Sequence, residues 1–173
     1  MKKIILTVFA GSSLLLYSTP SFAISLSVGV PIGATIENDA GTEADGASGY
    51  FLGVQLPFGL GLGMDSHKTK IKDTTYKVAH TMYNLYYQLP VPVVSLILGL
   101  GTGNSNYDCP GCAVFDKGAA TQWYTSIGFP IIPLFDIHLS YRSITSKNIK
   151  PKGGTTKQDV SGTITGIGIA FNF

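Results

Sequence analysis

The chain has 173 residues, with 12 basic and 10 acidic side chains and a formal net charge of +2. Two lysines at the N-terminus account for this excess, so the charge gives no reason to expect a nucleic-acid partner. Beyond residue 23, no apolar run approaches the roughly 18 residues expected of a membrane-spanning helix. With 45% hydrophobic residues, the chain is either an exported all-β domain or a membrane barrel.

Residues 1–23 have the layout of a secretory signal peptide. Two lysines open the segment, an apolar run follows, and Ser21 and Ala23 close it with small side chains. The run is too short for a helix that crosses a bilayer, which takes about 20 residues. We therefore expect cleavage after Ala23, with a retained N-terminal anchor as the alternative. Residues 24–173 would then form one domain of 150 residues with equal numbers of basic and acidic side chains.

Period-two alternation of apolar with small or polar residues runs through the rest of the chain and predicts β-strands. The alternation indicates an all-β fold, and a soluble β-sandwich is the alternative to a barrel. Eight strands are expected, at about residues 24–36, 48–58, 60–64, 75–89, 94–101, 122–129, 135–142 and 163–173.

The last strand shows the alternation most clearly. Ile167, Ile169, Phe171 and Phe173 share one face, and small residues or asparagine occupy the other. Large apolar side chains on one face, ending on an aromatic residue, are typical of a barrel strand in lipid.

The connections between the expected strands alternate in kind. Short proline-containing turns lie at 57–59, 89–92 and 129–133, where proline marks strand ends. Longer polar loops lie at about 37–47, 65–74, 102–118 and 145–159, and they hold nearly all of the charged residues. Within strands we expect only Asp136 and Arg142 to be charged, both facing inward. This arrangement predicts periplasmic turns and extracellular loops.

This layout resembles the superfamily of small eight-stranded outer-membrane β-barrels, which includes the OmpA transmembrane domain and OmpX. The resemblance implies an antiparallel up-and-down transmembrane barrel in the outer membrane of a Gram-negative bacterium. It implies a monomer surrounded by outer-membrane lipid and lipopolysaccharide, without a cofactor or metal. The strand that ends at Phe173 also resembles the signal read by the outer-membrane assembly machinery, with Ile167, Ile169 and Phe171 as its other members. No motif identifies a subfamily.

The inward positions are rich in polar side chains and glycine. An eight-stranded barrel is just wide enough for its own side chains to fill, so a packed polar plug is expected. A narrow wet passage is the alternative, because glycine leaves space. The polar set comprises His80, Asn84, Tyr86, Gln88, Tyr124, Asp136, His138 and Arg142.

His138 and Ser140 form a His-x-Ser pair similar to that of some outer-membrane lipid A deacylases. Here both residues are expected inside the barrel rather than facing lipid, and no glutamate follows in the last strand or its loop. We therefore expect polar lining and no catalysis at this pair.

Two features of the expected loops could carry interactions. Cys109 and Cys112 flank Pro-Gly, which suits a tight turn, and they should form a disulfide in an oxidising compartment. Lysines of the second and fourth loops could meet lipopolysaccharide phosphates, with ordinary solvated loops as the alternative. The candidate contacts are Lys68, Lys70, Lys72, Lys77, Lys147, Lys150 and Lys152.

The sequence therefore predicts a non-enzymatic integral outer-membrane protein, structural or interacting with the cell surface through its loops. A narrow channel for small or hydrophobic solutes is the first alternative. A lipid A-modifying enzyme is the second.

Overall fold

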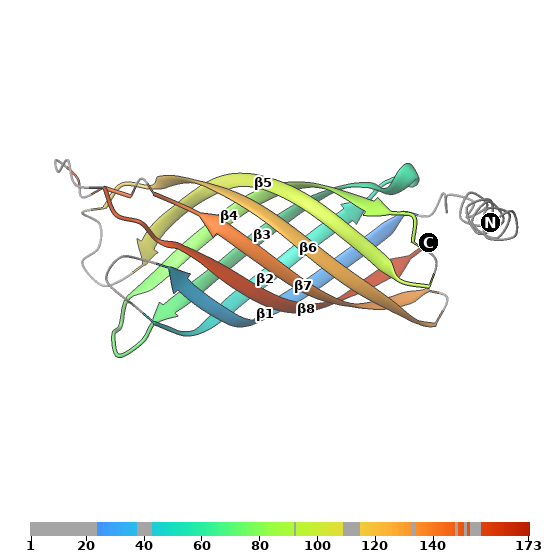
Figure 1. The fold of residues 1–173 in the computed structure, drawn as a ribbon, viewed down its shortest axis with the longest axis horizontal. Helices are drawn as coiled ribbons and strands as arrows, with labels where there is room; N and C mark the ends of the chain where they lie inside the picture. The colour runs from blue at the N-terminus through green and yellow to red at the C-terminus, as the bar shows by residue number, and fades with distance from the viewer. Residues whose placement is uncertain are drawn as a thin grey trace, which may run out of the picture.

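The computed structural model describes residues 24–37, 43–91, 93–108, 115–132, 134–147, 149–150, 152 and 157–173. In these residues the chain forms a closed barrel of eight antiparallel strands, each paired with its sequence neighbours (Figure 1). The strands are β1 (Ser25–Glu37), β2 (Ala44–Gln55), β3 (Leu60–Ile71), β4 (Lys77–Leu89), β5 (Ser95–Asp108), β6 (Gly118–Ile132), β7 (Phe135–Thr145) and β8 (Ser161–Asn172). A short 3-10 turn, η1 (Pro57–Gly59), joins β2 to β3.

The expected signal peptide at 1–23 and the expected Cys109–Cys112 disulfide lie outside the described residues and remain predictions. In the described part of the chain, no helix is long and apolar enough to cross a bilayer.

Pairing of β8 with β1 closes the barrel. The register runs from Ser25 opposite Asn172 to Glu37 opposite Ser161, with one shift between Pro31 and Gly33. Closure leaves no unpaired sheet edge in the barrel. The eight-stranded up-and-down barrel expected from the sequence is confirmed.

Two strands extend further than expected. β3 continues to Ile71 and β5 to Asp108, so the ranges 65–74 and 102–118 are not simply loops. Their outward side chains become polar or charged before the strands end, which hides the apolar alternation. As a consequence Asp65 lies within β3 with its side chain buried, and the expectation that only Asp136 and Arg142 are charged within strands is wrong.

The outer surface of the barrel is apolar around its circumference, as the parity of the last strand predicted. Leu52, Leu85, Leu139 and Ile169 are exposed on four different strands. Aromatic pairs lie on the same surface, including Trp123 with Tyr141 (ring centroids 5.7 Å apart). This is the surface that a barrel presents to lipid.

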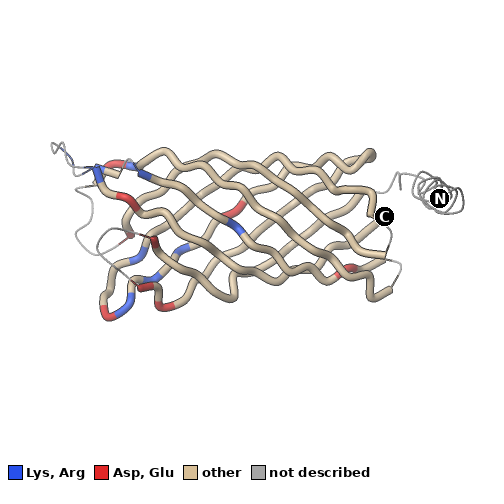
Figure 2. The backbone as a smooth tube through the Cα atoms, in the orientation of Figure 1, with Lys and Arg blue, Asp and Glu red and all other residues tan. Residues whose placement is uncertain are grey.

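Charged side chains are distributed unevenly along the barrel axis (Figure 2). They gather at the end that carries the long connections, here called the loop end. The opposite end, here called the turn end, carries the short turns and both termini of the strand system (Figure 1). Asp65 and Arg142 lie inside the barrel, and Asp136 lies inside it close to the turn end.

Candidate functional site

The inward glycines of the barrel make room for large inward side chains. A Cβ added at Gly61 would lie 2.1 Å from the ring of Tyr86, and one at Gly99 would lie 2.1 Å from the ring of Tyr124. Small and large inward residues alternate in this way in narrow barrels. The glycines therefore accommodate the packed interior rather than lining an open passage.

A buried carboxylate organises the middle of the barrel. Oδ2 of Asp65 accepts hydrogen bonds from Asn84 Nδ2 (2.9 Å), Gln122 Nε2 (2.7 Å) and Arg142 Nε (3.0 Å). These four residues come from β3, β4, β6 and β7, and all four are buried. We call this set the central network; it links opposite sides of the barrel wall.

Arg142 is enclosed by aromatic rings as well as by polar partners. Its guanidinium carbon lies 3.6 Å from the centroid of the Phe51 ring and 5.0 Å from that of Tyr124. It also donates to the hydroxyl of Ser140. Because a guanidinium interacts favourably with the face of an aromatic ring, Phe51 and Tyr124 help to hold this buried cation.

Between the central network and the loop end the interior is filled by two further layers. One is a pair of buried imidazoles, His67 and His80, with ring centroids 5.1 Å apart; His80 Nδ1 lies 2.6 Å from Ser105 Oγ. The other is an apolar cluster that contains Val78, Ile149 and Val160. Residues of the fourth long connection thus pack against the strands and close this end of the interior.

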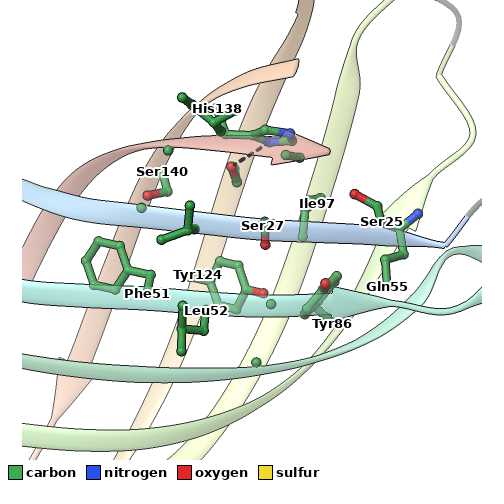
Figure 3. Close-up of a pocket in the computed structure, with 18 of the residues that line it drawn as sticks. Ser25, Ser27, Phe51, Leu52, Gln55, Tyr86, Ile97, Tyr124, His138 and Ser140 are labelled. Carbon is green, nitrogen blue, oxygen red and sulfur yellow. Dashed lines mark hydrogen bonds between the residues drawn. The ribbon is translucent and has the colours of Figure 1, made fainter. Parts of the chain in front are cut away.

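Between the central network and the turn end lies a small cavity of about 60 Å³ (Figure 3). Its wall includes Ser25, Gln55, Tyr86 and Tyr124, and the two tyrosine rings contact edge to face. This volume is enough for a few water molecules. Asp65, Asn84 and Arg142 of the central network also line the cavity.

Polar side chains near the turn end form a second, looser group. Gln88 Nε2 donates to Ser95 Oγ, and Ser95 Oγ donates to Asp136 Oδ2, both at 3.2 Å. Asp136 Oδ2 lies 3.9 Å from His138 Nε2, which is too long for a direct hydrogen bond. His138 Nδ1 lies 3.4 Å from the hydroxyl of Ser126.

The His-x-Ser pair lies inside the barrel, as the strand parity predicted. Ser140 donates to the carbonyl of Gly166 (3.3 Å) and accepts a hydrogen bond from Arg142. His138 is buried and lies over Gly128. Neither side chain faces the lipid surface, where the acyl chains of lipid A would lie.

All eight inward polar residues expected from the sequence line or fill the interior, but sequence reasoning missed several of their partners. The sequence pattern predicts a loop at Asp65 and does not place Phe51 or His67 in the interior. The signal was present in the alternation: counting by twos from Gly61 or Gly63 places both Asp65 and His67 inward.

At the loop end, three of the candidate lipopolysaccharide-binding lysines are held by acidic partners. Lys68 Nζ lies 2.6 Å from Asp108 and Lys70 Nζ lies 2.5 Å from Asp45. Lys72 pairs with Glu43. The hydrogen bond and charge of Lys72 lower the pKa of Glu43, and those of Glu43 raise the pKa of Lys72. We call these three the paired lysines.

The other lysines at this end have a different environment. The salt bridges among the described residues include no partner for Lys77, Lys147, Lys150, Lys152 or Lys157. Four of these five belong to the connection between β7 and β8. We call those four the loop-four lysines; three of them are exposed, Lys150 is half-buried, and no salt bridge among the described residues includes them.

Comparison with known proteins identifies the fold. No protein-family model and no curated protein sequence matches the chain. The structure of Neisserial surface protein A superposes with a TM-score of 0.65 and 16% identity, covering 87% of this chain and 96% of that one. The chain has the fold of the small eight-stranded outer-membrane barrels.

Two further outer-membrane barrels support this assignment. OprG of Pseudomonas aeruginosa has a TM-score of 0.54 and 12% identity, over 89% of this chain and 97% of its own. Ail, the attachment invasion locus protein of Yersinia pestis, has a TM-score of 0.51 and 16% identity, over 87% and 97%. Together with the apolar outer surface, these neighbours agree with the outer-membrane location expected from the sequence. In such a barrel the turn end faces the periplasm and the loop end faces outward.

Proposed function

We propose that this chain is an integral outer-membrane protein that acts at the outer surface of the cell and does not conduct solutes through its interior. The observation that carries the proposal is the central network. Asp65 and Arg142 meet across the barrel at mid-height, and Asn84 and Gln122 donate hydrogen bonds to the same carboxylate. A solute would have to displace a buried ion pair, which is costly because each charge would then lose its partner in a poorly solvated site.

Planar-bilayer recording tests this proposal directly. The wild-type protein should show no stable unit conductance at neutral pH. The matched comparison is Arg142→Ala, which shortens the side chain beside the cavity. Lys70→Ala at the loop end is the control for the loss of one positive charge. Stable unit conductance of the wild type would overturn the proposal and favour the channel alternative.

At the outer surface, the ligand that best fits the charges is the phosphorylated saccharide of lipopolysaccharide. The loop-four lysines have positive charge that described acidic groups do not neutralise, whereas each paired lysine has a carboxylate in contact. Anionic groups are attracted to uncompensated cations. One neighbour, Ail, has been crystallised with the heparin analogue sucrose octasulfate, an anionic saccharide derivative. This neighbour is consistent with an anion-binding surface on a barrel of this fold.

Binding of purified lipopolysaccharide separates the two sets of lysines. The double variant Lys150→Gln/Lys152→Gln should bind less lipopolysaccharide than the wild type, and the loss should shrink at high salt because the charges are exposed. The control variant replaces a whole ion pair, Lys70→Gln with Asp45→Asn, and should bind as the wild type does. Equal losses of lipopolysaccharide binding in both variants would show that the charge of the whole loop end, and not the loop-four lysines, accounts for the binding.

We propose no catalytic role for this protein. His138 and Ser140 are inside the barrel, and Ser140 is occupied by Arg142 and Gly166. The mass of lipid A from cells that carry the wild type and from cells that carry His138→Ala should be the same. A difference between them would favour the enzyme alternative.

A further inference from the structure

The turn end of the barrel has an unusual surface, because its exposed side chains are apolar rather than polar. In the described part of the chain, the only charged side chain at this end is that of Asp136, which is buried inside the barrel (Figure 2). The exposed apolar residues lie in or beside all three short turns. They are Phe58, Val91, Val93, Ile131, Ile132 and Leu134, and we call this set the apolar rim.

The apolar rim is strongly exposed. Val93 is 83% exposed and Ile131 is 62% exposed. Exposed apolar side chains gathered at one end of a protein mark a place where another apolar phase or partner covers it. Since the rim involves the turns β2–β3, β4–β5 and β6–β7, it surrounds the barrel axis instead of lying on one side of it.

One turn holds its apolar side chain at a cost in backbone strain. Val93 has φ of 78°, in the left-handed region that a β-branched residue rarely adopts. Glycine or asparagine would take this conformation with less strain. The turn therefore keeps a bulky apolar group at the tip where a small or polar residue would be easier to accommodate.

The height of the apolar outer surface along the barrel axis can be compared with the thickness of the apolar part of a bilayer. On β3 the outward side chains are apolar from Leu60 until Ser66 and charged from Lys68; on β5 they are apolar from Leu96 until Thr102. With a rise of about 3.4 Å per residue and a tilt near 40°, these stretches span roughly 16–21 Å. The apolar band of a barrel in lipid is about 25 Å tall, so at β3 and β5 the strands alone are too short for it.

We propose that the apolar rim is inserted in the periplasmic leaflet, where it contacts the upper acyl chains of phospholipid, so that the turns complete the apolar band. A planar leaflet can contact all three turns at once, which fits their positions around the barrel axis. A protein partner bound to one side would leave part of the ring exposed to water. The absence of exposed charged side chains at this end, within the described residues, lowers the cost of such insertion, and the C-terminal carboxylate of Phe173 must lie at the headgroup level.

Tryptophan fluorescence in lipid vesicles tests this proposal. The single native tryptophan is first replaced by Trp123→Phe, and reporters are introduced as Val93→Trp or Ile131→Trp on two different turns. Phosphatidylcholine brominated near the top of its acyl chains serves as the lipid quencher and acrylamide as the aqueous quencher. Ile127→Trp, on the lipid-facing surface of β6, and Lys152→Trp, in the fourth loop, provide the lipid and water references.

Both reporters on the apolar rim should emit at shorter wavelength than the Lys152→Trp reporter. Acrylamide should quench them much less than it quenches Lys152→Trp, and the brominated lipid should quench them. Acrylamide quenching equal to that of Lys152→Trp, without quenching by lipid, would overturn the proposal and place the turns in water. Protection from both quenchers that depends on protein concentration would also overturn it, because a second copy would then cover the rim. Altered migration of unheated protein on a detergent gel confirms that each variant is folded.

Discussion

A cation and a carboxylate meet in two places in this barrel, and their surroundings differ. In the central network, Arg142 and Asp65 are buried at mid-height, with side chains only 7% and 2% exposed. At the loop end, Lys70 and Asp45 are about half exposed. Interactions between charges strengthen as the local dielectric falls, but so does the cost of leaving one charge unpaired. The Arg142–Asp65 pair is therefore expected to contribute strongly to the stability of the barrel, whereas the Lys70–Asp45 pair is expected to contribute little.

The largest effect should follow from breaking the buried pair. Arg142→Met leaves Asp65 as an unpaired buried carboxylate, and loss of one partner from a buried pair costs about 3–5 kcal/mol. Urea-induced unfolding in lipid vesicles measures this loss. Adding Asp65→Asn to the same chain should restore much of the stability, because the uncompensated charge is gone.

Failure of Asp65→Asn to restore stability would attribute the loss to packing against Phe51 and Tyr124 instead of to charge. Lys70→Met is the matched single substitution at the loop end. If it destabilised the barrel as much as Arg142→Met, the distinction between the two regions would be wrong.

The next effect tests how tightly the interior is packed. Gly99→Ala would place a Cβ 2.1 Å from the ring of Tyr124, and overpacking of this kind costs about 1–3 kcal/mol. Gly63→Ala is the matched control, since the nearest atom to its Cβ would be 3.1 Å away. The same unfolding measurement should rank Gly99→Ala as the less stable variant. Equal stability of the two would indicate that the tyrosine moves aside at little cost.

A smaller effect is expected from the exposed pair. Lys70→Ala should leave the unfolding midpoint unchanged within error, because an exposed ion pair gains little in water and is screened by salt. A double-mutant cycle with Asp45→Ala measures the coupling between the two residues. Coupling as strong as that between Arg142 and Asp65 would contradict the assignment of Lys70 to a solvated site.

The smallest effect concerns the protonation of Glu43 at the loop end. Lys72 holds the pKa of the Glu43 carboxyl below its usual value through a hydrogen bond and its charge. The contribution of this pair to stability is therefore present above the usual pKa of glutamate and is lost as the pH falls through the lowered pKa. Carboxyl titration by NMR should show the pKa of Glu43 rising towards its usual value in Lys72→Ala. An unchanged titration would show that the two groups do not interact in solution.

The sequence predicted the outward surface better than the interior contacts. Apolar alternation revealed the lipid-facing residues of all eight strands, because period-two geometry is local to each strand. It did not reveal where β3 and β5 end, since both continue beyond the apolar region with polar outward side chains. The alternation therefore predicts a loop at Asp65, and it gives no sign of the pairing of Asp65 with Arg142.

The lysines at the loop end show the same limit. Lys68, Lys70 and Lys72 were candidates for contact with phosphate groups, and alternation alone did not indicate the acidic side chain that lies beside each of them. A one-residue change of register would turn these side chains to the other face, and no local pattern specifies the register of β2 or β5 against its neighbours.

By itself, the sequence determined that this chain is an eight-stranded barrel with an apolar exterior, polar loops and a polar, glycine-rich interior. Strand direction, side-chain parity and turn positions are local properties that neighbouring residues encode. Only the tertiary structure showed how the interior side chains pack against one another. The closed register sets Gly61 beside Tyr86 and Gly99 beside Tyr124, and it brings Asp65 within reach of Arg142 from the far side of the barrel. Such contacts depend on how distant strands are aligned, which local alternation does not specify.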